Sequence, residues 1–158
     1  MKRLLLLPFL FVNILLFAQV SFTQLGTDID GEATYDHNGS SVSLSSDGTV
    51  IAIGANNNDG NGVNAGHVRI FENIGSSWFQ IGQDIDAEAG GDQSGNSVSL
   101  SSDGSKVAIG AYYNDGSGTD AGHVRIFENI GGSWSQIGQD IDGEAAGDQS
   151  GISVSLSS

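Results

Sequence analysis

The chain has 158 residues, enough for at most one ordinary domain, and it contains no cysteine. This composition excludes a disulfide scaffold, a thiolate nucleophile, and zinc-thiolate or iron–sulfur sites. With 5 Lys and Arg against 19 Asp and Glu, the formal net charge is −14. Nucleic acid is therefore not expected as a partner, because its phosphates are bound by clustered basic side chains.

Residues 1–18 are predicted to be a secretory signal peptide. Two basic residues precede an apolar run that ends at the small residue Ala18. The run contains Pro8 and Asn13 and is shorter than the roughly 20 residues that a membrane-spanning helix needs. We therefore expect a secreted or cell-surface protein with no transmembrane segment after cleavage. A retained membrane anchor is the weaker alternative.

The rest of the chain is a tandem repeat. Residues 39–94 and 95–150 align without a gap over 56 positions, of which 13 differ. Residues 19–38 match the end of a unit and are expected to hold the last strand of a preceding unit and its connection. Residues 151–158 restart the unit and stop, so we interpret the chain as a fragment of a longer repeat protein.

Each unit is predicted to form four strands. In the second copy, apolar and polar residues alternate on both sides of the turn at Asp103-Gly104, which indicates a hairpin. A loop rich in Gly and Asn leads to a third alternating segment, and a turn precedes a fourth segment rich in aromatic and branched residues. The four predicted strands cover residues 97–101, 106–110, 122–128 and 133–138.

These features predict an all-β protein, and the best fit is a β-propeller in which each 56-residue unit is a four-stranded blade. No window after residue 18 has the helical period. A solenoid of flat sheets is the alternative, but its coils usually take about 20 to 30 residues, so each unit would need two. Two complete units cannot close a ring by themselves.

The repeat resembles the FG-GAP repeat of integrin α-subunit propellers and of many bacterial surface proteins. The resemblance rests on the order Gly, Ser-Val-Ser-Leu, turn, Val-Ala-Ile-Gly-Ala, loop and Gly-His-Val-Arg-Ile-Phe, and it covers the whole exported chain. Ser94-Gly95 stands where the family has Phe-Gly, and Gly54-Ala55-Asn56 stands where it has Gly-Ala-Pro. The repeat is most similar to the divergent bacterial branch. The resemblance implies adhesion or ligand binding rather than catalysis.

Calcium is the one candidate cofactor. The resemblance implies an Asp-x-Asp-x-Asp-Gly calcium loop in the first hairpin, but each copy has a single acid there, Asp47 or Asp103, which we interpret as a turn residue. A second candidate is the acidic segment after the fourth strand, where alternation brings carboxylates to one side; a solvated connection is the alternative. Its candidate ligands are Asp84, Asp86, Glu88 and Asp92, with Asp140, Asp142, Glu144 and Asp148 in the second copy.

Catalytic groups are not indicated by the sequence. His67 and His123 recur at one unit position on strands whose apolar residues face the other way, and no carboxylate at a fixed near spacing orients the imidazole, so a structural role is expected. The serines follow strand alternation, and none lies in a Gly-x-Ser-x-Gly elbow. Because an active site is made once, residues copied with every repeat indicate scaffold. We therefore do not expect this chain to be an enzyme.

The loop between the second and third strands is the expected ligand-facing surface. Five of the nine positions in 56–64 differ from their counterparts in the second copy, a higher density than elsewhere. Variable loops on a constant scaffold commonly carry binding residues. The same loop is also a third candidate for calcium, although Asn-Asp-Gly also simply makes turns. The candidate contacts are Asn58, Asp59, Asn61, Tyr112, Tyr113, Asn114 and Asp115.

The function expected from the sequence is a secreted or cell-surface binding and adhesion module. Its partner would be an extracellular protein or a carbohydrate. Two alternatives stay open: an accessory propeller of an extracellular hydrolase whose catalytic domain lies beyond Ser158, and a purely structural surface repeat.

Overall fold

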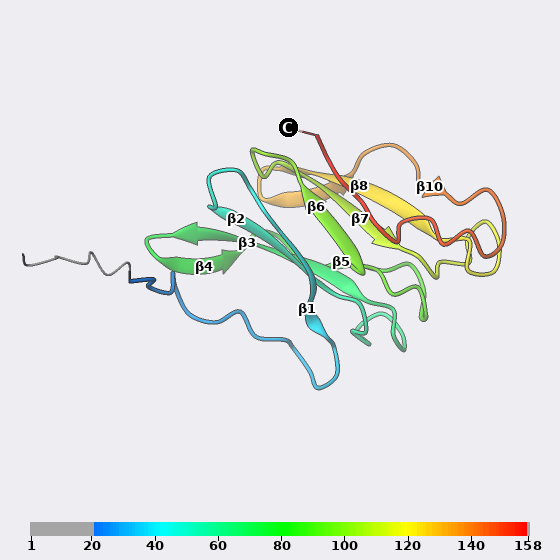
Figure 1. The fold of residues 1–158 in the computed structure, drawn as a ribbon, viewed down its shortest axis with the longest axis horizontal. Coiled ribbons are helices and arrows are strands. Elements are labelled where there is room, and N and C mark those ends of the chain that lie inside the picture. Colours follow the sequence, from blue (N-terminus) through cyan, green and yellow to red (C-terminus); the bar gives the residue numbers. More distant parts are fainter. Residues whose placement is uncertain (1–20, 158) are drawn as a thin grey trace, which may run out of the picture.

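The computed structural model describes residues 21–157, whose regular secondary structure is all strand (Figure 1). The predicted signal peptide, residues 1–18, lies outside the described residues. Within the described part, no helix is long and apolar enough to cross a membrane. The all-β prediction is confirmed.

The first sheet is antiparallel and is formed by five consecutive strands. Its order is β1-β2-β3-β4, and the short strand β5 also pairs with β3. The strands are β1 (Asn38–Leu44), β2 (Val50–Ala55), β3 (His67–Ile74), β4 (Ser77–Gln80) and β5 (Ile85–Asp86).

The second sheet repeats this topology. Strands β6, β7 and β8 lie in order, and both β9 and β10 pair with β8. The strands are β6 (Ser97–Leu100), β7 (Lys106–Ala111), β8 (His123–Ile130), β9 (Ser133–Gln136) and β10 (Ile141–Asp142). The first four match the four strands predicted for this copy to within two residues at each end.

Two short strands share the fourth position of each sheet, which the sequence did not predict. In the first sheet, β4 pairs with residues 71–74 of β3, while β5 pairs with His67 and Val68. Gly82 lies between β4 and β5 with a φ of 73°, a conformation that favours glycine. The chain therefore leaves the sheet after β4 and returns for two residues.

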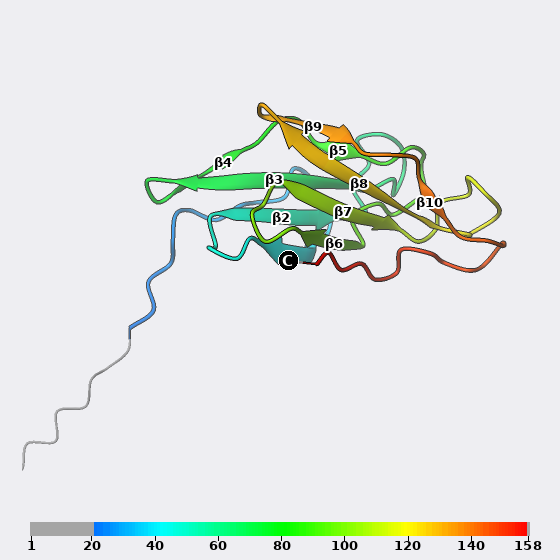
Figure 2. The same cartoon turned by 90° about the horizontal axis from the view of Figure 1, so that it is seen from above.

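The sheets pack face to back around one apolar core. Because side chains alternate across a strand, each sheet has two different faces. One face of the first sheet contacts the opposite-type face of the second, and Figure 2 shows the two sheets stacked. The core side chains are Val50, Ala52, Val68, Ile70 and Ile85 from the first sheet and Val98, Leu100, Val107, Ile109, Phe127 and Trp134 from the second.

Glycines bring the sheets into backbone contact. A Cβ on Gly54 of β2 would collide with the carbonyl oxygen of Gly95, which precedes β6. Gly110 and Gly151 form the same contact 56 residues later. Gly54 belongs to Gly54-Ala55-Asn56 and Gly95 to Ser94-Gly95, so the segments that correspond to the two family motifs meet at the junction between consecutive units.

The segments outside the sheets make contacts equivalent to those between the two units. Leu25 O accepts a hydrogen bond from Trp78 Nε1 at 3.0 Å, just as Ile81 O accepts one from Trp134 Nε1 at 3.0 Å. Residues 21–37 contain no strand, yet they lie against the first sheet as the β4–β5 segment lies against the second. At the other end, Leu156 N donates to Ser99 Oγ at 3.0 Å, so residues 151–157 run beside β6.

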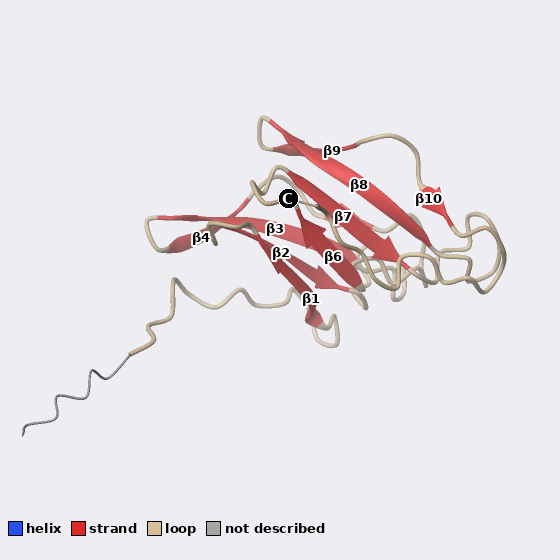
Figure 3. Cartoon of the chain, turned by 45° about the horizontal axis from the view of Figure 1, so that its top comes forward, coloured by secondary structure: helices blue, strands red, loops and turns tan. Residues whose placement is uncertain are grey.

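The long loops of both units lie at one end of the sheets, and the tight hairpin turns lie at the other (Figure 3). The loop between β2 and β3 spans residues 56–66, and the loop between β7 and β8 spans 112–122. The connection after β5 lies at the same end as these loops. This end carries the candidate binding surface.

Candidate functional site

The two long loops share one backbone framework. Asn58 and Asn114 were expected to face a ligand, but both side chains are buried. Asn58 Nδ2 donates to Asp36 Oδ2 at 2.9 Å, and Asn114 Nδ2 donates to Asp92 Oδ2 at 3.1 Å. These two residues therefore fix each loop to the connection from the preceding unit, and this corrects their expected orientation.

Exposed polar residues also hold the shape of each loop. Asp59 Oδ1 accepts from Asn64 N at 2.7 Å, and Asp115 Oδ1 accepts from Asp120 N at 2.8 Å. Asn61 Nδ2 donates to Ala87 O at 2.6 Å. Asp59, Asn61 and Asp115 are exposed, so their side chains remain accessible from solvent.

Tyr112 and Tyr113 distinguish the second loop from the first. Their ring centroids are 4.0 Å apart with an interplanar angle of 35°, and both side chains are half-buried. The Tyr112 hydroxyl donates to Gln93 Oε1 at 2.8 Å. Burial, together with the neighbouring Tyr113, raises the pKa of Tyr112, so its hydroxyl stays protonated at neutral pH. The pair forms an aromatic surface where the first copy has Asn56 and Asn57.

The predicted acidic ligands are divided between different environments. Asp84 accepts from Gln80 Nε2 at 2.6 Å and lies beside His67. The backbone carbonyl of Asp86 accepts from Arg125 Nη2 at 2.6 Å. Asp92 is buried and accepts from Ala89 N, so it shapes the connection. The four acids of one copy therefore do not converge on one point.

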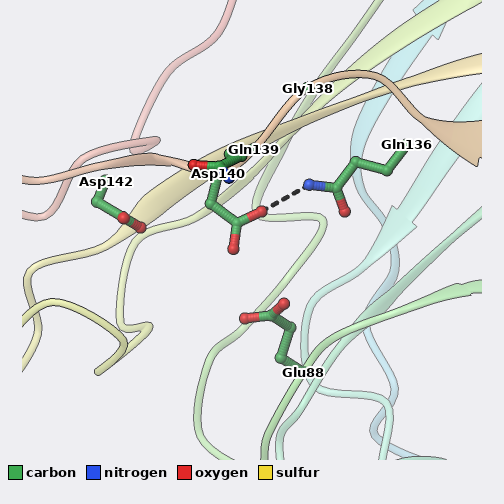
Figure 4. A pocket seen from close by; sticks show the side chains of 6 residues that line it. All are labelled: Glu88, Gln136, Gly138, Gln139, Asp140 and Asp142. Atoms are coloured by element: carbon green, nitrogen blue, oxygen red, sulfur yellow. Dashed lines mark hydrogen bonds between the residues drawn. The ribbon is translucent and has the colours of Figure 1, made fainter.

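Acids from consecutive copies converge instead. Glu88 from the first copy lies across from Asp140 of the second, and Asp142 lines the same open pocket of about 590 Å³ (Figure 4). Gln136 Nε2 donates to Asp140 Oδ1 at 2.7 Å, which orients that carboxylate. Glu144 and Asp148 are exposed, and Asp148 Oδ2 accepts from Ala145 N at 2.8 Å.

A histidine completes this group of acids. His123, at the start of β8, is 1% exposed, and its Nδ1 lies 3.7 Å from Asp140 Oδ2 and 4.0 Å from Glu88 Oε2. Burial, with the Arg125 guanidinium close by, lowers the pKa of His123 and keeps the imidazole neutral at neutral pH. We name His123, Glu88 and Asp140 the second junction cluster.

The first copy has the same arrangement. His67 Nδ1 lies 3.6 Å from Asp84 Oδ2 and 3.9 Å from Glu32 Oε2. His67, Glu32 and Asp84 form the first junction cluster. The expectation from sequence concerned only acids at a near spacing, whereas these acids are distant in sequence and approach the imidazole only where two units touch.

The first hairpin of each unit does not fit calcium. Asp47 Oδ1 accepts hydrogen bonds from Thr49 N, Thr49 Oγ1 and Ser45 Oγ at 2.7 to 2.9 Å. These bonds lower the pKa of Asp47, and equivalent bonds from Ser101 and Ser105 lower that of Asp103. One carboxylate, whose Oδ1 already accepts three hydrogen bonds, cannot supply the six to eight oxygens of a calcium site.

The stacked sheets and their repeated junction indicate a class of protein. Stacked antiparallel sheets, joined face to back by a repeated junction, are the units of a β-propeller. A family model described as the FG-GAP repeat matches residues 27–71 and 86–127, more than half of the chain. The protein belongs to the FG-GAP repeat family, whose repeats are typically extracellular and form adhesion-type propellers. A comparison with curated proteins gave no match.

Proposed function

We propose that this protein is a secreted or cell-surface binding module that holds an extracellular protein or a carbohydrate at the loop end of its sheets, without chemistry of its own. One observation carries the proposal: the two long loops share a hydrogen-bonded framework but present different outer side chains. Asn58 and Asn114 fix the loops in the same way, while Asn56-Asn57 is replaced by Tyr112-Tyr113.

The tyrosine pair suits recognition rather than catalysis. Tyrosine supplies a rigid apolar ring and a hydroxyl that donates and accepts, a combination common at binding interfaces. The pair is half-buried and held by Gln93, so little side-chain entropy is lost when a ligand covers it. Loops placed on a rigid sheet framework are also the usual location of binding residues.

The test uses beads coated with the purified protein on panels of immobilised polysaccharides and immobilised extracellular proteins. The variant Tyr112→Asn/Tyr113→Asn gives the second loop the residues of the first and keeps its framework. Retention on at least one surface should fall by about tenfold in this variant, as for the loss of a central aromatic contact. The control Asn56→Ala/Asn57→Ala should be retained normally.

Two results would contradict the proposal. One is the absence of retention on every surface of both panels. The other is retention that the tyrosine substitutions leave unchanged, which would place binding elsewhere on the molecule. Retention on only one of the two panels would decide between a carbohydrate and a protein ligand.

A further inference from the structure

The second junction cluster contains a buried nitrogen without a hydrogen-bond partner. His123 is 1% exposed, and among the described residues neither of its ring nitrogens has a partner within hydrogen-bond geometry; Nδ1 is the nitrogen that faces the two acids. Its two carboxylate neighbours are 3.7 and 4.0 Å away, beyond the range of a good hydrogen bond. Buried polar atoms are rarely left without a partner, and here the unpartnered Nδ1 lies beside two carboxylates, so the three groups are arranged to share one further partner.

The distances suit a bridging cation. One nitrogen and two carboxylate oxygens all lie within 4.8 Å of one another. Tetrahedral bonds of about 2.1 Å place ligand atoms about 3.4 Å apart, so each of the two nitrogen–oxygen pairs must shorten by about 0.3 to 0.6 Å, and the two carboxylate oxygens must approach each other to the same spacing. Glu88 and Asp140 have side chains that are 47% and 26% exposed, and so they have room to move. Gln136 holds Asp140 Oδ1 and leaves Oδ2 facing the histidine.

The donor set selects the kind of cation. An imidazole nitrogen with carboxylate oxygens suits a divalent transition metal, whereas calcium takes oxygen ligands alone. The negative charge of the two carboxylates exceeds the positive charge of the nearby Arg125 guanidinium, so the cluster attracts a cation. That guanidinium donates a hydrogen bond to Asp86 O and lies over the Phe127 ring. The open pocket beside Glu88 and Asp140 gives the ion and its water ligands a route from solvent.

The cluster recurs with the repeat. In the first junction cluster, His67 Nδ1 has two equivalent neighbours, Asp84 Oδ2 at 3.6 Å and Glu32 Oε2 at 3.9 Å. Glu32 Oε1 also lies 3.8 Å from Arg69 Nη1. Each cluster takes its Glu from the segment before a unit and its His and Asp from within that unit. A metal in this position would therefore link consecutive units.

We propose that each junction between consecutive units binds one divalent transition-metal ion, held by His123 Nδ1, Glu88 and Asp140 at the second junction and by His67, Glu32 and Asp84 at the first. The site shares no residue with the set of loop contacts in which ligand binding is proposed. It also differs from the all-oxygen calcium set that the sequence indicated, because it combines acids from two copies with a histidine.

The test is calorimetric titration of the untagged, purified full chain with Zn²⁺. Two ions per chain should bind to the unchanged protein. Asp140→Asn should weaken one of the two sites at least tenfold, and Asp84→Asn/Asp140→Asn should weaken both. The controls are Asp142→Asn, which alters an acid of the same pocket outside the cluster, and His37→Gln, which alters an exposed histidine; both should retain two sites.

Cobalt gives a second readout, which tests the histidine ligand instead of the acids. Co²⁺ bound at the junctions should show visible d–d absorption that changes in His123→Gln. If that buried substitution prevents folding, as judged by far-UV circular dichroism, the titration of Asp140→Asn decides.

Three results would overturn the proposal. The first is no zinc binding by the folded chain. The second is equal loss in Asp140→Asn and Asp142→Asn, which would indicate general attraction to an acidic surface. The third is ready displacement of zinc by equimolar Ca²⁺, which would contradict the assignment of a transition metal.

Discussion

The two units contain nearly the same residues, yet equivalent side chains differ widely in burial. Val42 and Leu44 of β1 are 60% and 56% exposed, whereas their counterparts Val98 and Leu100 of β6 are 9% and 6% exposed. The β6 side chains face the first sheet, and the described residues place no sheet against the same face of β1. The difference shows that a unit obtains its core from its neighbour.

On the other face of the sheets, it is the first unit that is covered and the second that is exposed. Ile85 of β5 is 6% exposed because the second sheet covers it, while Ile141 of β10 is 54% exposed. The polar contacts do not follow this rule. His67 and Arg69 are buried as deeply as His123 and Arg125, because the segment before β1 already covers them. A connecting segment is therefore sufficient to complete the polar junction, but a whole sheet is needed to complete the apolar one.

The largest effect is expected at the backbone contact between the sheets. Gly54→Ala should lower the free energy of unfolding by about 3 kcal/mol, because the new Cβ meets the Gly95 carbonyl and the sheets must separate. Gly110→Ala should cost less, since it displaces only the segment around Gly151. Urea unfolding measures the free energy of unfolding of both variants. An equal loss in the two would contradict the claim that the Gly54 contact joins two sheets while the Gly110 contact holds only a terminal segment.

A large difference is also expected between two leucines. Leu100→Ala should cost about 3 kcal/mol, the usual range for a buried leucine, because it leaves a cavity between the sheets. Leu44→Ala should cost less than about 1 kcal/mol, as for an exposed side chain. The same urea unfolding experiment compares them. If Leu44→Ala lowers the free energy of unfolding as much as Leu100→Ala, then Leu44 is buried in solution, and the proposed difference between the two units is wrong.

A smaller difference is expected for the two tryptophans. Trp134→Phe should cost about 1 kcal/mol, because its Nε1 hydrogen bond to Ile81 O lies in the core and the acceptor would lose its partner. Trp78→Phe removes the equivalent bond to Leu25 O at a more exposed position, where water replaces it. Thermal unfolding followed by circular dichroism should show a lower Tm for Trp134→Phe than for Trp78→Phe.

The smallest effect concerns pH. Hydrogen bonds from Ser101 and Ser105 hold the pKa of Asp103 below its usual value. The ionised carboxylate therefore contributes stability above the unfolded-state pKa of about 3.9, and this contribution is lost as the pH falls toward the folded-state pKa. Asp103→Asn should make stability less dependent on pH between about pH 4 and pH 2. A slope identical to that of the unchanged protein would show that these bonds contribute nothing.

The strands could be predicted from sequence because alternation is local. The turn at Asp103-Gly104 and the alternating apolar pairs Val98/Leu100 and Val107/Ile109 on either side of it define β6 and β7 without reference to any other part of the chain. The short strand β10 could not be predicted in this way. It contains only Ile141 and Asp142, and it forms because the chain returns to β8 after Gly138.

The junction clusters illustrate a second limit of sequence analysis. Glu88 and His123 are 35 positions apart in the chain, and nothing local to either residue marks their approach. The available signal was periodic: His, Asp and Glu recur together at the repeat length. Asn58 and Asn114 show the converse, since a loop composition rich in turn residues does not reveal which amide is buried against Asp36 or Asp92.

The most direct test of the account measures thiol reactivity. The chain has no cysteine, so a single cysteine introduced by Leu44→Cys or Leu100→Cys reports only on its own position. In the native state, we predict that the thiol at position 44 reacts with a maleimide nearly as fast as in urea, and that the thiol at position 100 is strongly protected. Equal protection, or equal reactivity, at the two positions would contradict the claim that each unit obtains its core from its neighbour.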